Sequence, residues 1–229
     1  MGAESAERVI AKYTGLAPPH GAGPLILGCF LPRTRMNPTE LLAAHVQQKL
    51  ALLPDELAEL LAQFKPRVVK KKQLLIQPGF VATSRSFVAQ GAMHAYLVDA
   101  AGRERTIQLA IDDWWITDYN SYIYQQPATM FVAALEDSRV LQLDYAAEQR
   151  LKAASHRFET FFRLLAERAA AYQQRRVIAG FMQTAEQRYD DLLAQYPQLG
   201  QRIPLRVLAS YLNMTPEFLS KIRHNKLNT

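Results

Sequence analysis

The spacing of apolar residues changes twice along this chain, and this limits the folds open to it. Between residues 39 and 62 apolar side chains recur at helical spacing, and Pro54 divides the run into two short helices. After Pro66 the apolar segments become short, as in strands, and from Ala146 the helical spacing returns. The sequence therefore predicts two helices, then a β domain, then a helical carboxy-terminal part.

The middle part is predicted to be an antiparallel β domain. Its apolar segments are rich in β-branched residues, and turn residues separate them, including Pro78-Gly79, Gly91 and the hairpin turn 99–102. Many short strands at regular spacing indicate a jelly-roll-like sandwich or barrel that ends near Asp144. The predicted strands are residues 68–76, 87–90, 93–98, 106–111, 131–135 and 140–143.

The positive charge of the chain is concentrated at its carboxyl end. The chain has 27 Lys or Arg and 21 Asp or Glu residues, a formal charge of +6. Residues 1–150 have 15 of each sign, residues 151–199 have 7 basic and 5 acidic, and residues 200–229 have 5 basic and 1 acidic. The last segment, at +4, is therefore the one expected to attract phosphate groups.

Composition excludes several classes of protein. With 49% hydrophobic residues the chain is too apolar to be disordered. The single Cys29 excludes an internal disulfide framework and a multi-cysteine metal or iron–sulfur site. The longest apolar run, residues 25–31, is too short to span a membrane, and no secretion signal precedes it. We expect a cytoplasmic protein without membrane contact, metal or catalytic residues.

A long helix is predicted over residues 158–182, where no proline occurs and the first glycine is Gly180. At 1.5 Å per residue it extends over roughly 35 Å. Near-heptad spacing of apolar residues favours a homodimer through paired helices, and the alternative is a core helix within one chain. The predicted dimer contacts are Phe158, Phe161, Leu165, Ala169 and Tyr172.

Residues 203–226 predict a helix-turn-helix. Asn213 suits the left-handed turn conformation, Thr215 is a helix N-cap, Pro216 occupies the first helical position and Glu217 the first turn. Leu205, Leu208, Ala209 and Leu212 face inward on the first helix, and Phe218, Leu219 and Ile222 anchor the second. The alternative is a helix corner without a nucleic-acid partner. The predicted DNA contacts are Thr215, Glu217, Ser220, Lys221, Arg223 and His224.

This order of parts resembles the Crp/Fnr superfamily of bacterial transcription regulators, over about residues 40 to 226. The strings Ile203-Pro204-Leu205, Thr215-Pro216-Glu217 and Leu219-Ser220-Lys221-Ile222-Arg223 are most similar to short members found in Bacteroidetes-type bacteria. The resemblance implies an α+β fold: an antiparallel β-roll sensor domain, a long dimerisation helix and a small all-α helix-turn-helix domain. Since the sequence stops at Thr229, we expect this last domain to lack the wing of longer members.

The same resemblance locates the effector pocket. In cyclic-nucleotide-binding members a Phe-Gly-Glu cassette supplies a glutamate for the ribose and an arginine for the cyclic phosphate. Laid on this sequence, it puts Thr117 and Asp118 at the Gly-Glu position, Tyr119 after them, and Pro127 with Ala128 at the Arg position. Proline offers neither charge nor donor, so cyclic AMP is not expected to bind by the usual mode. The pocket is either filled by aromatic residues or altered for a different small effector.

In the family, an Arg-Glu-x-x-x-Arg pattern on the second helix reads bases, and here Pro216, Glu217 and Lys221 occupy its positions. Glu217 is expected to accept from cytosine and Lys221 to donate to guanine. The predicted function is a homodimeric, sequence-specific DNA-binding regulator, not an enzyme, with RNA polymerase as a further partner. The alternative is a nucleotide-like ligand-binding module whose helix-turn-helix contacts protein.

The expected domain organisation has four parts. Residues 1–36 are expected to form a loose extension. This extension is either a functional arm or a segment that precedes the folded part of the chain. Residues 37–150 form the β-roll, 151–182 the dimerisation helix and 183–229 the truncated helix-turn-helix domain.

Overall fold

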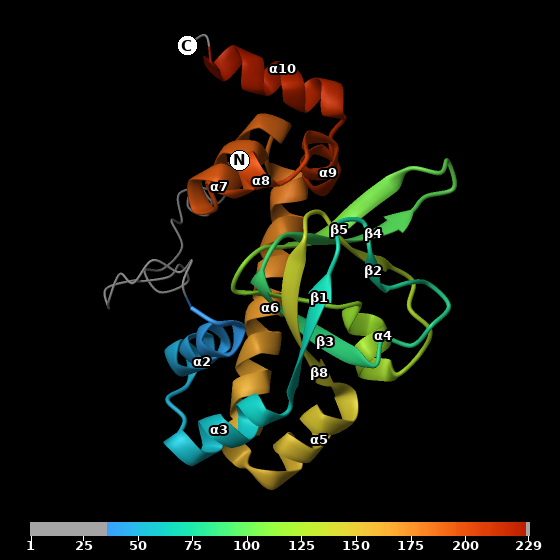
Figure 1. Ribbon diagram of the computed structural model, residues 1–229. Helices are drawn as coiled ribbons and strands as arrows, with labels where there is room; N and C mark the ends of the chain where they lie inside the picture. Colours follow the sequence, from blue (N-terminus) through green and yellow to red (C-terminus); the bar gives the residue numbers. More distant parts are fainter. Residues whose placement is uncertain (1–35, 228–229) are drawn as a thin grey trace, which may run out of the picture. The chain divides into compact units, whose positions relative to one another are not determined.

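The computed structural model describes residues 36–227, which belong to one compact unit (Figure 1). The predicted amino-terminal extension lies outside the described residues, apart from its last residue. Two helices come first, α2 (Pro38–Lys49) and α3 (Pro54–Ala62), and Pro54 begins the second, as the sequence predicted. Pro38 begins α2 in the same way. The side chains of Asn37 and Glu40 cap α2 reciprocally, at 2.9 and 3.0 Å.

The β domain consists of two four-stranded antiparallel sheets. One, sheet A, has the order β1-β8-β3-β6, and the other, sheet B, has the order β2-β7-β4-β5. The strands of sheet A are β1 (Phe64–Val69), β3 (Ser84–Gln90), β6 (Trp114–Ile116) and β8 (Ser138–Asp144). Those of sheet B are β2 (Leu74–Ile76), β4 (Met93–Val98), β5 (Glu104–Ala110) and β7 (Phe131–Ala134).

The strand predicted over residues 68–76 is two strands in the structure. Gln73 N–H donates to Lys70 O at 2.9 Å, and Lys72 has φ +69°, so the chain turns here and passes from sheet A to sheet B. The prediction failed because the lysine run 70–72 was interpreted as part of a strand, whereas it forms the turn. Strand β6 was not predicted, since its three residues lie within an aromatic segment that shows no alternation.

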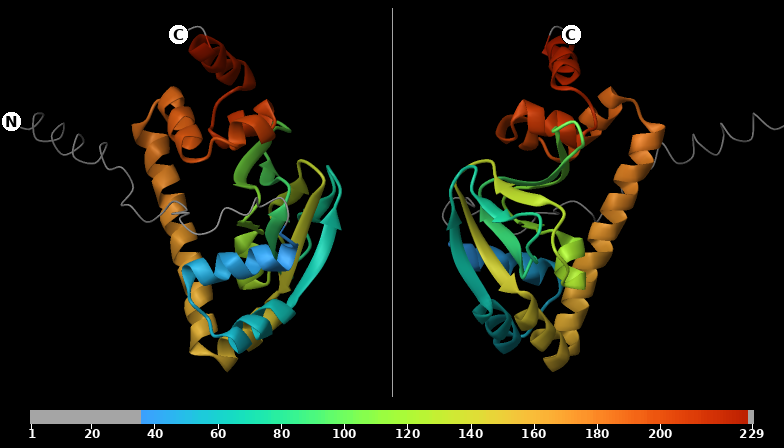
Figure 2. Two further views of the ribbon diagram at one scale, coloured as in Figure 1. Left: turned by 60° about the vertical axis from the view of Figure 1, so that its left-hand side comes forward. Right: turned by 90° about the vertical axis from the view of Figure 1, so that its right-hand side faces the viewer.

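Two hydrophobic cores lie on opposite sides of sheet A. Between the sheets, Val88 and Val140 of sheet A pack with Met93, Ala95 and Val132 of sheet B. On the other side of sheet A, helices α2, α3, α5 and α6 cover the strands (Figures 1 and 2). Alternate residues of a strand point to opposite faces, so β3 places its apolar residues in both cores.

Gly91 is required at the turn between β3 and β4. Its φ is +119°, and a Cβ atom there would lie 2.1 Å from Ser138 Oγ. Any side chain would therefore separate the β3–β4 turn from the start of β8.

The helical half begins with α5 (Tyr145–Ala154), which follows β8 directly, and continues with α6 (His156–Met182). Ser155 separates the two, and its Oγ accepts from Arg157 N–H at 3.2 Å. Helix α6 contains the whole segment for which a long helix was predicted. Among the described residues no helix is long and apolar enough to cross a bilayer.

The remaining helices are α7 (Ala185–Gln195), α8 (Leu199–Arg202), α9 (Leu205–Tyr211) and α10 (Pro216–Leu227). They share a third hydrophobic core, which also includes Ala92, Leu109 and Ile111 of the β domain. The carboxy-terminal helices thus pack on the end of sheet B that contains β5.

His94 is a buried polar residue of sheet B. Its ring stacks on that of Tyr96, with centroids 4.6 Å apart, and Tyr96 stacks on Phe131 at 5.1 Å. Burial, with a smaller contribution from the charge of Arg206, lowers the pKa of His94 to about 4. The ring is therefore neutral at pH 7.

This burial predicts a pH dependence of stability. Because the pKa of His94 is about 4 in the folded chain and 6.5 when exposed, the unfolded chain binds the proton more tightly. Stability is therefore lost as the pH falls from about 6.5 to 4, by up to about 3 kcal/mol. We expect urea unfolding to show a smaller loss over this range in His94→Phe, which keeps the ring stack.

The exposed His156 at the start of α6 supplies the control, since His156→Gln should keep the dependence of the unchanged chain. Burial also lowers the pKa of His45, so a residual slope is expected in His94→Phe. A slope unchanged by His94→Phe would contradict the assignment.

Candidate functional site

The helix pair α9 and α10 has the local geometry that the sequence predicted. Asn213 has φ +57°, in the left-handed region, and Met214 N–H donates to Ala209 O at 3.0 Å. Thr215 Oγ1 accepts from Phe218 N–H at 3.2 Å, as an N-cap does. The turn is therefore fixed by three consecutive residues, and it sets the direction in which α10 leaves.

One face of α10 is buried and the other is exposed. Leu219 and Ile222 lie in the core of the carboxy-terminal helices. Phe218 was expected to anchor α10 beside them, but 47% of it is exposed, because its position in the helix turns it away from α9. The exposed residues of the helix are Glu217, Phe218, Ser220, Lys221, His224, Asn225 and Lys226.

Two basic residues of α10 are used within the chain. Arg223 is partly buried and donates to Gly200 O at 3.1 Å, at the end of α8. Lys226 Nζ lies 2.9 Å from Asp190 and 3.4 Å from Glu186 of α7. Lys221 is exposed, and the structure gives it no ion pair among the described residues. Of the predicted contacts, Thr215, Glu217, Ser220, Lys221 and His224 stay on the accessible side, whereas Arg223 braces the domain.

The other basic residues after position 200 pair with acidic residues of the β domain. Arg206 Nη1 lies 3.2 Å from Glu104. Arg202 Nη1 lies 2.7 Å from Asp112, and Arg202 also pairs with Glu136. The charge excess of residues 200–229 thus partly serves docking of the helices, which the charge count by segment did not reveal.

Polar contacts complete this docking. Ser210 Oγ accepts from Thr106 N–H and donates to Glu104 O, each at 2.9 Å. The Tyr172 hydroxyl of α6 lies 2.6 Å from that of Tyr211, and burial raises the pKa of both. Arg176 of α6 lies over the Tyr211 ring, 4.0 Å from its centroid. Helix α9 is therefore held to both β5 and α6.

The cassette region forms α4 (Tyr119–Tyr124) and the loop after it. Asp118, at the Glu position of the cassette, is fully buried and accepts from Ser121 N–H at 3.1 Å. Its other oxygen accepts from Thr129 and Met130 N–H, at 3.0 and 3.1 Å. The carboxylate therefore caps α4 and closes the loop, and both its oxygens are occupied within the chain.

The Arg position of the cassette is covered by the chain itself. Val81 and Pro127 form an isolated antiparallel bridge, and Ala128 N–H donates to Phe80 O at 2.9 Å. Thr117 Oγ1 donates to Ser84 O at 3.2 Å. Tyr119 is partly exposed at the start of α4. The predicted pocket residues thus make their hydrogen bonds and bridges within the chain, to residues 79–84 and to residues 121–130.

A buried cation lies beside this cassette, and the sequence did not identify it. Arg85 of β3 lies 2.9 Å from Glu148 of α5, and both are buried. Tyr122 of α4 donates to the same carboxylate at 2.8 Å, and Lys152 lies 2.6 Å from its other oxygen. Burial and the nearby Glu148 raise the pKa of Tyr122, so its hydroxyl is protonated and can donate.

Aromatic rings surround the Arg85 guanidinium. Its central carbon lies 5.0 to 5.9 Å from four ring centroids, within cation–π range. The rings are those of Trp115, Tyr119, Tyr122 and Phe162. The aromatic residues of this region therefore enclose a cation of the chain itself. Two further arginines of the β domain do not join this cluster: Arg139 is exposed, and Arg105 is paired with Asp99.

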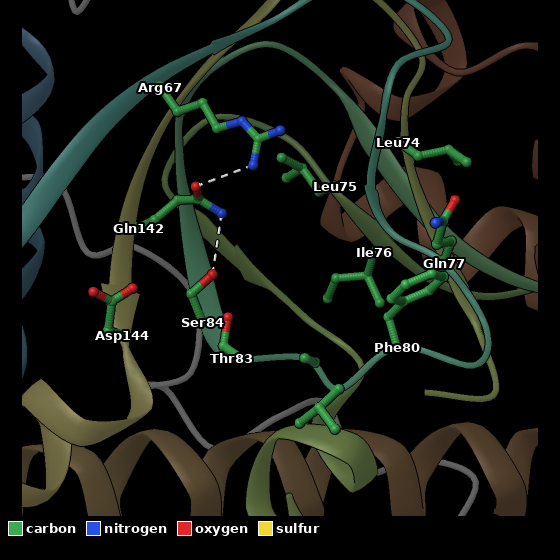
Figure 3. A pocket seen from close by; sticks show the side chains of 12 residues that line it. Arg67, Leu74, Leu75, Ile76, Gln77, Phe80, Thr83, Ser84, Gln142 and Asp144 are labelled. Atoms are coloured by element: carbon green, nitrogen blue, oxygen red, sulfur yellow. Dashed lines mark hydrogen bonds between the residues drawn. The ribbon is translucent and has the colours of Figure 1, made fainter. Parts of the chain in front are cut away.

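A separate hollow of about 440 Å³ opens between β1, β2 and β8 (Figure 3). On its polar side Arg67 donates to Gln142 at 3.4 Å, and Gln142 donates to Ser84 at 3.2 Å. Apolar residues of β2 and Phe80 form the other wall. None of its lining residues belongs to the cassette segment 117–128. No group of three or more His, Cys, Asp or Glu residues suited to a metal occurs in the described part of the chain.

The predicted dimer residues of α6 have mixed surroundings. Phe158 and Phe161 are fully buried in the core of their own chain, and Leu165 packs against that core. Tyr172 bonds to Tyr211, whereas Ala169 is exposed. The large apolar residues that α6 exposes are Val177, Ile178, Phe181 and Met182. The predicted stripe thus packs largely inward, and the exposed apolar surface lies further along the helix.

Several solved structures share this fold. FixK2 from Bradyrhizobium japonicum matches with a TM-score of 0.60 at 13% identity, over 71% of this chain and 83% of that chain. The c-di-GMP-responsive global regulator CLP from Xanthomonas campestris matches with a TM-score of 0.59 at 13% identity, over 76% of this chain and 91% of that chain. The Thermus thermophilus catabolite activator protein matches with a TM-score of 0.50 at 20% identity, over 80% of this chain and 87% of that chain.

At such low identity these likenesses show the fold, and the expected β-roll with a helical carboxy-terminal part is confirmed. No protein-family model and no curated protein matches the sequence.

The buried pair predicts a specific pattern of stability. Glu148→Leu leaves Arg85 charged and unpaired inside the chain, so we expect it to lower the free energy of unfolding by about 3 to 5 kcal/mol. The double variant Arg85→Met/Glu148→Leu removes both charges and leaves apolar groups within the aromatic rings. It should regain most of that loss in urea unfolding followed by circular dichroism.

Glu167→Gln is the matched control, because Glu167 pairs with Arg163 on the exposed surface of α6. Its effect should stay within about 0.5 kcal/mol. A double variant as unstable as the sum of its single changes would contradict the role given to the pair.

Proposed function

We propose that this protein is a homodimeric, sequence-specific DNA-binding transcription regulator of the Crp/Fnr type. The observation that carries the proposal is the accessible face of α10, behind a turn fixed by Asn213 and Thr215. Figures 1 and 2 show α10 on the far side of α7–α9 from the β-sheets. The second helix of such a pair enters the major groove with its amino-terminal residues at the base edges.

The residues of this face fit that role. Glu217 and Lys221 lie one helical turn apart and are both exposed. In this proposal Glu217 accepts from cytosine, and Lys221, its neighbour on the helix surface, donates to guanine. Thr215 and Ser220 are placed for phosphate contacts, together with His224. Because the other basic residues after position 200 are used within the chain, Lys221 is the main cationic contact in this proposal.

The exposed apolar surface of α6 supports a homodimer. Leu164, Ala171 and Ile178 recur every seven residues, and Phe181, 85% exposed, follows three residues after Ile178. At 3.6 residues per turn, Ile178 points about 160° away from the buried Phe158. A second copy of α6 is the partner that such a repeat accommodates. Two-fold symmetry then places DNA half-sites roughly 34 Å apart.

The sensor part of the proposal is limited by the cassette. Asp118 and the loop at Pro127 are bonded within the chain, and Arg85 is enclosed with Glu148, so we propose that cyclic AMP does not bind there by the usual mode. The structural neighbours are regulators rather than enzymes, which supports a cytoplasmic regulatory role with RNA polymerase as a further partner.

The hollow beside Arg67 favours the second candidate function, a small-ligand-binding module. Its polar and apolar walls face each other, as in sites for small molecules. Ligand binding in thermal-shift screening, together with no specific DNA complex, would select this alternative.

DNA binding is tested by selecting an operator from a random duplex library and measuring its complex by electrophoretic shift. Lys221→Ala should weaken the specific complex about five- to 150-fold and relax the preference at one base step. The affinity of the unchanged protein should fall steeply with added salt.

Lys71→Ala is the control, since it removes one exposed positive charge in the turn between β1 and β2, away from α10. It should leave the preference unchanged. Absence of any specific, salt-sensitive complex would overturn the proposed function. An equal loss on all DNA sequences with Lys221→Ala would make Lys221 a phosphate contact.

The dimer is tested by sedimentation equilibrium. Ile178→Glu places a charge at the centre of the proposed helix pairing, where burial without a partner is unfavourable, so the mass should fall from that of two chains to that of one. Ala153→Glu adds the same charge on the exposed side of α5 and should leave two chains together. A single-chain mass for the unchanged protein would refute the homodimer.

A further inference from the structure

Phe218 is exposed, whereas the other large apolar side chains described in α10, those of Leu219 and Ile222, pack into the helical core. The backbone N–H of Phe218 is bonded to Thr215 Oγ1, so Phe218 sits at a fixed position in the first turn of α10. The structure gives this ring no aromatic partner within the described part of the chain. The helix thus presents a phenyl ring to solvent at the end that carries the proposed base contacts.

The neighbours of Phe218 define what the ring can contact. Glu217 precedes it, and Lys221 follows one turn later, both exposed. In the major groove, hydrogen-bonding groups read donors and acceptors, whereas the C5 methyl group of thymine is the apolar feature, and phenylalanine is among the side chains that contact it. A ring beside an acceptor and a donor on the exposed side of one helix therefore complements a thymine next to a G·C pair.

We propose that Phe218 reads a thymine of the operator through its C5 methyl group. This inference rests on the proposed DNA-binding function. It assigns a specificity role to a residue that the sequence pattern placed in the core. The ring has no hydrogen-bonding group, so it adds no phosphate contact, and its effect is confined to the base step it covers.

The test removes the methyl group alone. Each thymine of the selected operator is replaced in turn by deoxyuridine, which keeps every hydrogen-bonding group, and affinity is measured at one fixed salt concentration. Burying one methyl group corresponds to about a four-fold change in affinity, so one thymine per half-site should show about a four-fold loss. Replacing the symmetry-related pair together should give about fifteen-fold.

The variants then assign that loss to Phe218. Phe218→Ala should bind the thymine and deoxyuridine operators equally, and Phe218→Leu, still apolar, should keep part of the difference. Asn225→Ala is the control on the same helix, since Asn225 is exposed and is not among the proposed DNA contacts, and it should keep the full difference. Circular dichroism of each variant, compared with the unchanged chain, verifies that α10 is intact.

Three results would overturn the proposal that Phe218 reads a thymine. If the unchanged protein binds its operator but is insensitive to every deoxyuridine, the ring reads no methyl group. If Phe218→Ala keeps the four-fold difference, another residue reads it. If no sequence is enriched in the selection, the proposed function fails first, and the inference fails with it.

Discussion

The buried ion pair between Arg85 and Glu148 connects the sheet with the helices that cover it. It joins β3 of the sheet to α5, and through the rings of Tyr122 and Phe162 it also includes α4 and α6. Two buried charges are tolerated only when they are paired and their remaining groups bonded, and Tyr122 and Lys152 meet that requirement. The cluster thus links sheet A to its covering helices, beside the hydrophobic core in which Phe158, Phe161 and Phe162 of α6 are buried.

In both candidate sites, most charged residues are paired or hydrogen-bonded within the chain. In the cassette, both oxygens of Asp118 are bonded within the chain, and the neighbouring cation, Arg85, lies among aromatic rings and is paired with Glu148. At the carboxyl end, Arg202 and Arg206 hold the helices to the β domain. The proposed recognition of DNA therefore rests on few cations and on the shape and chemistry of the accessible face of α10, which includes the exposed ring of Phe218.

Local features were predicted well because their causes are local. The left-handed turn at Asn213, the N-cap at Thr215 and the helix boundaries near Pro54 depend on residues a few positions away, so the sequence contains their explanation. Predictions failed where a distant partner decides. The lysine run 70–72 forms a turn because the strands on either side join different sheets, and Phe161 packs inward because the helix lies against its own domain.

The order of elements, the β domain and the left-handed turn between α9 and α10 could be predicted from the sequence, since apolar periodicity and cap residues act through neighbouring positions. The sequence also showed that the Arg position of the cassette is Pro127. Only the tertiary structure decided which charges remain available. An ion pair such as Arg202 with Asp112 joins residues far apart in the chain, and no count of charge along a sequence contains the distance between them.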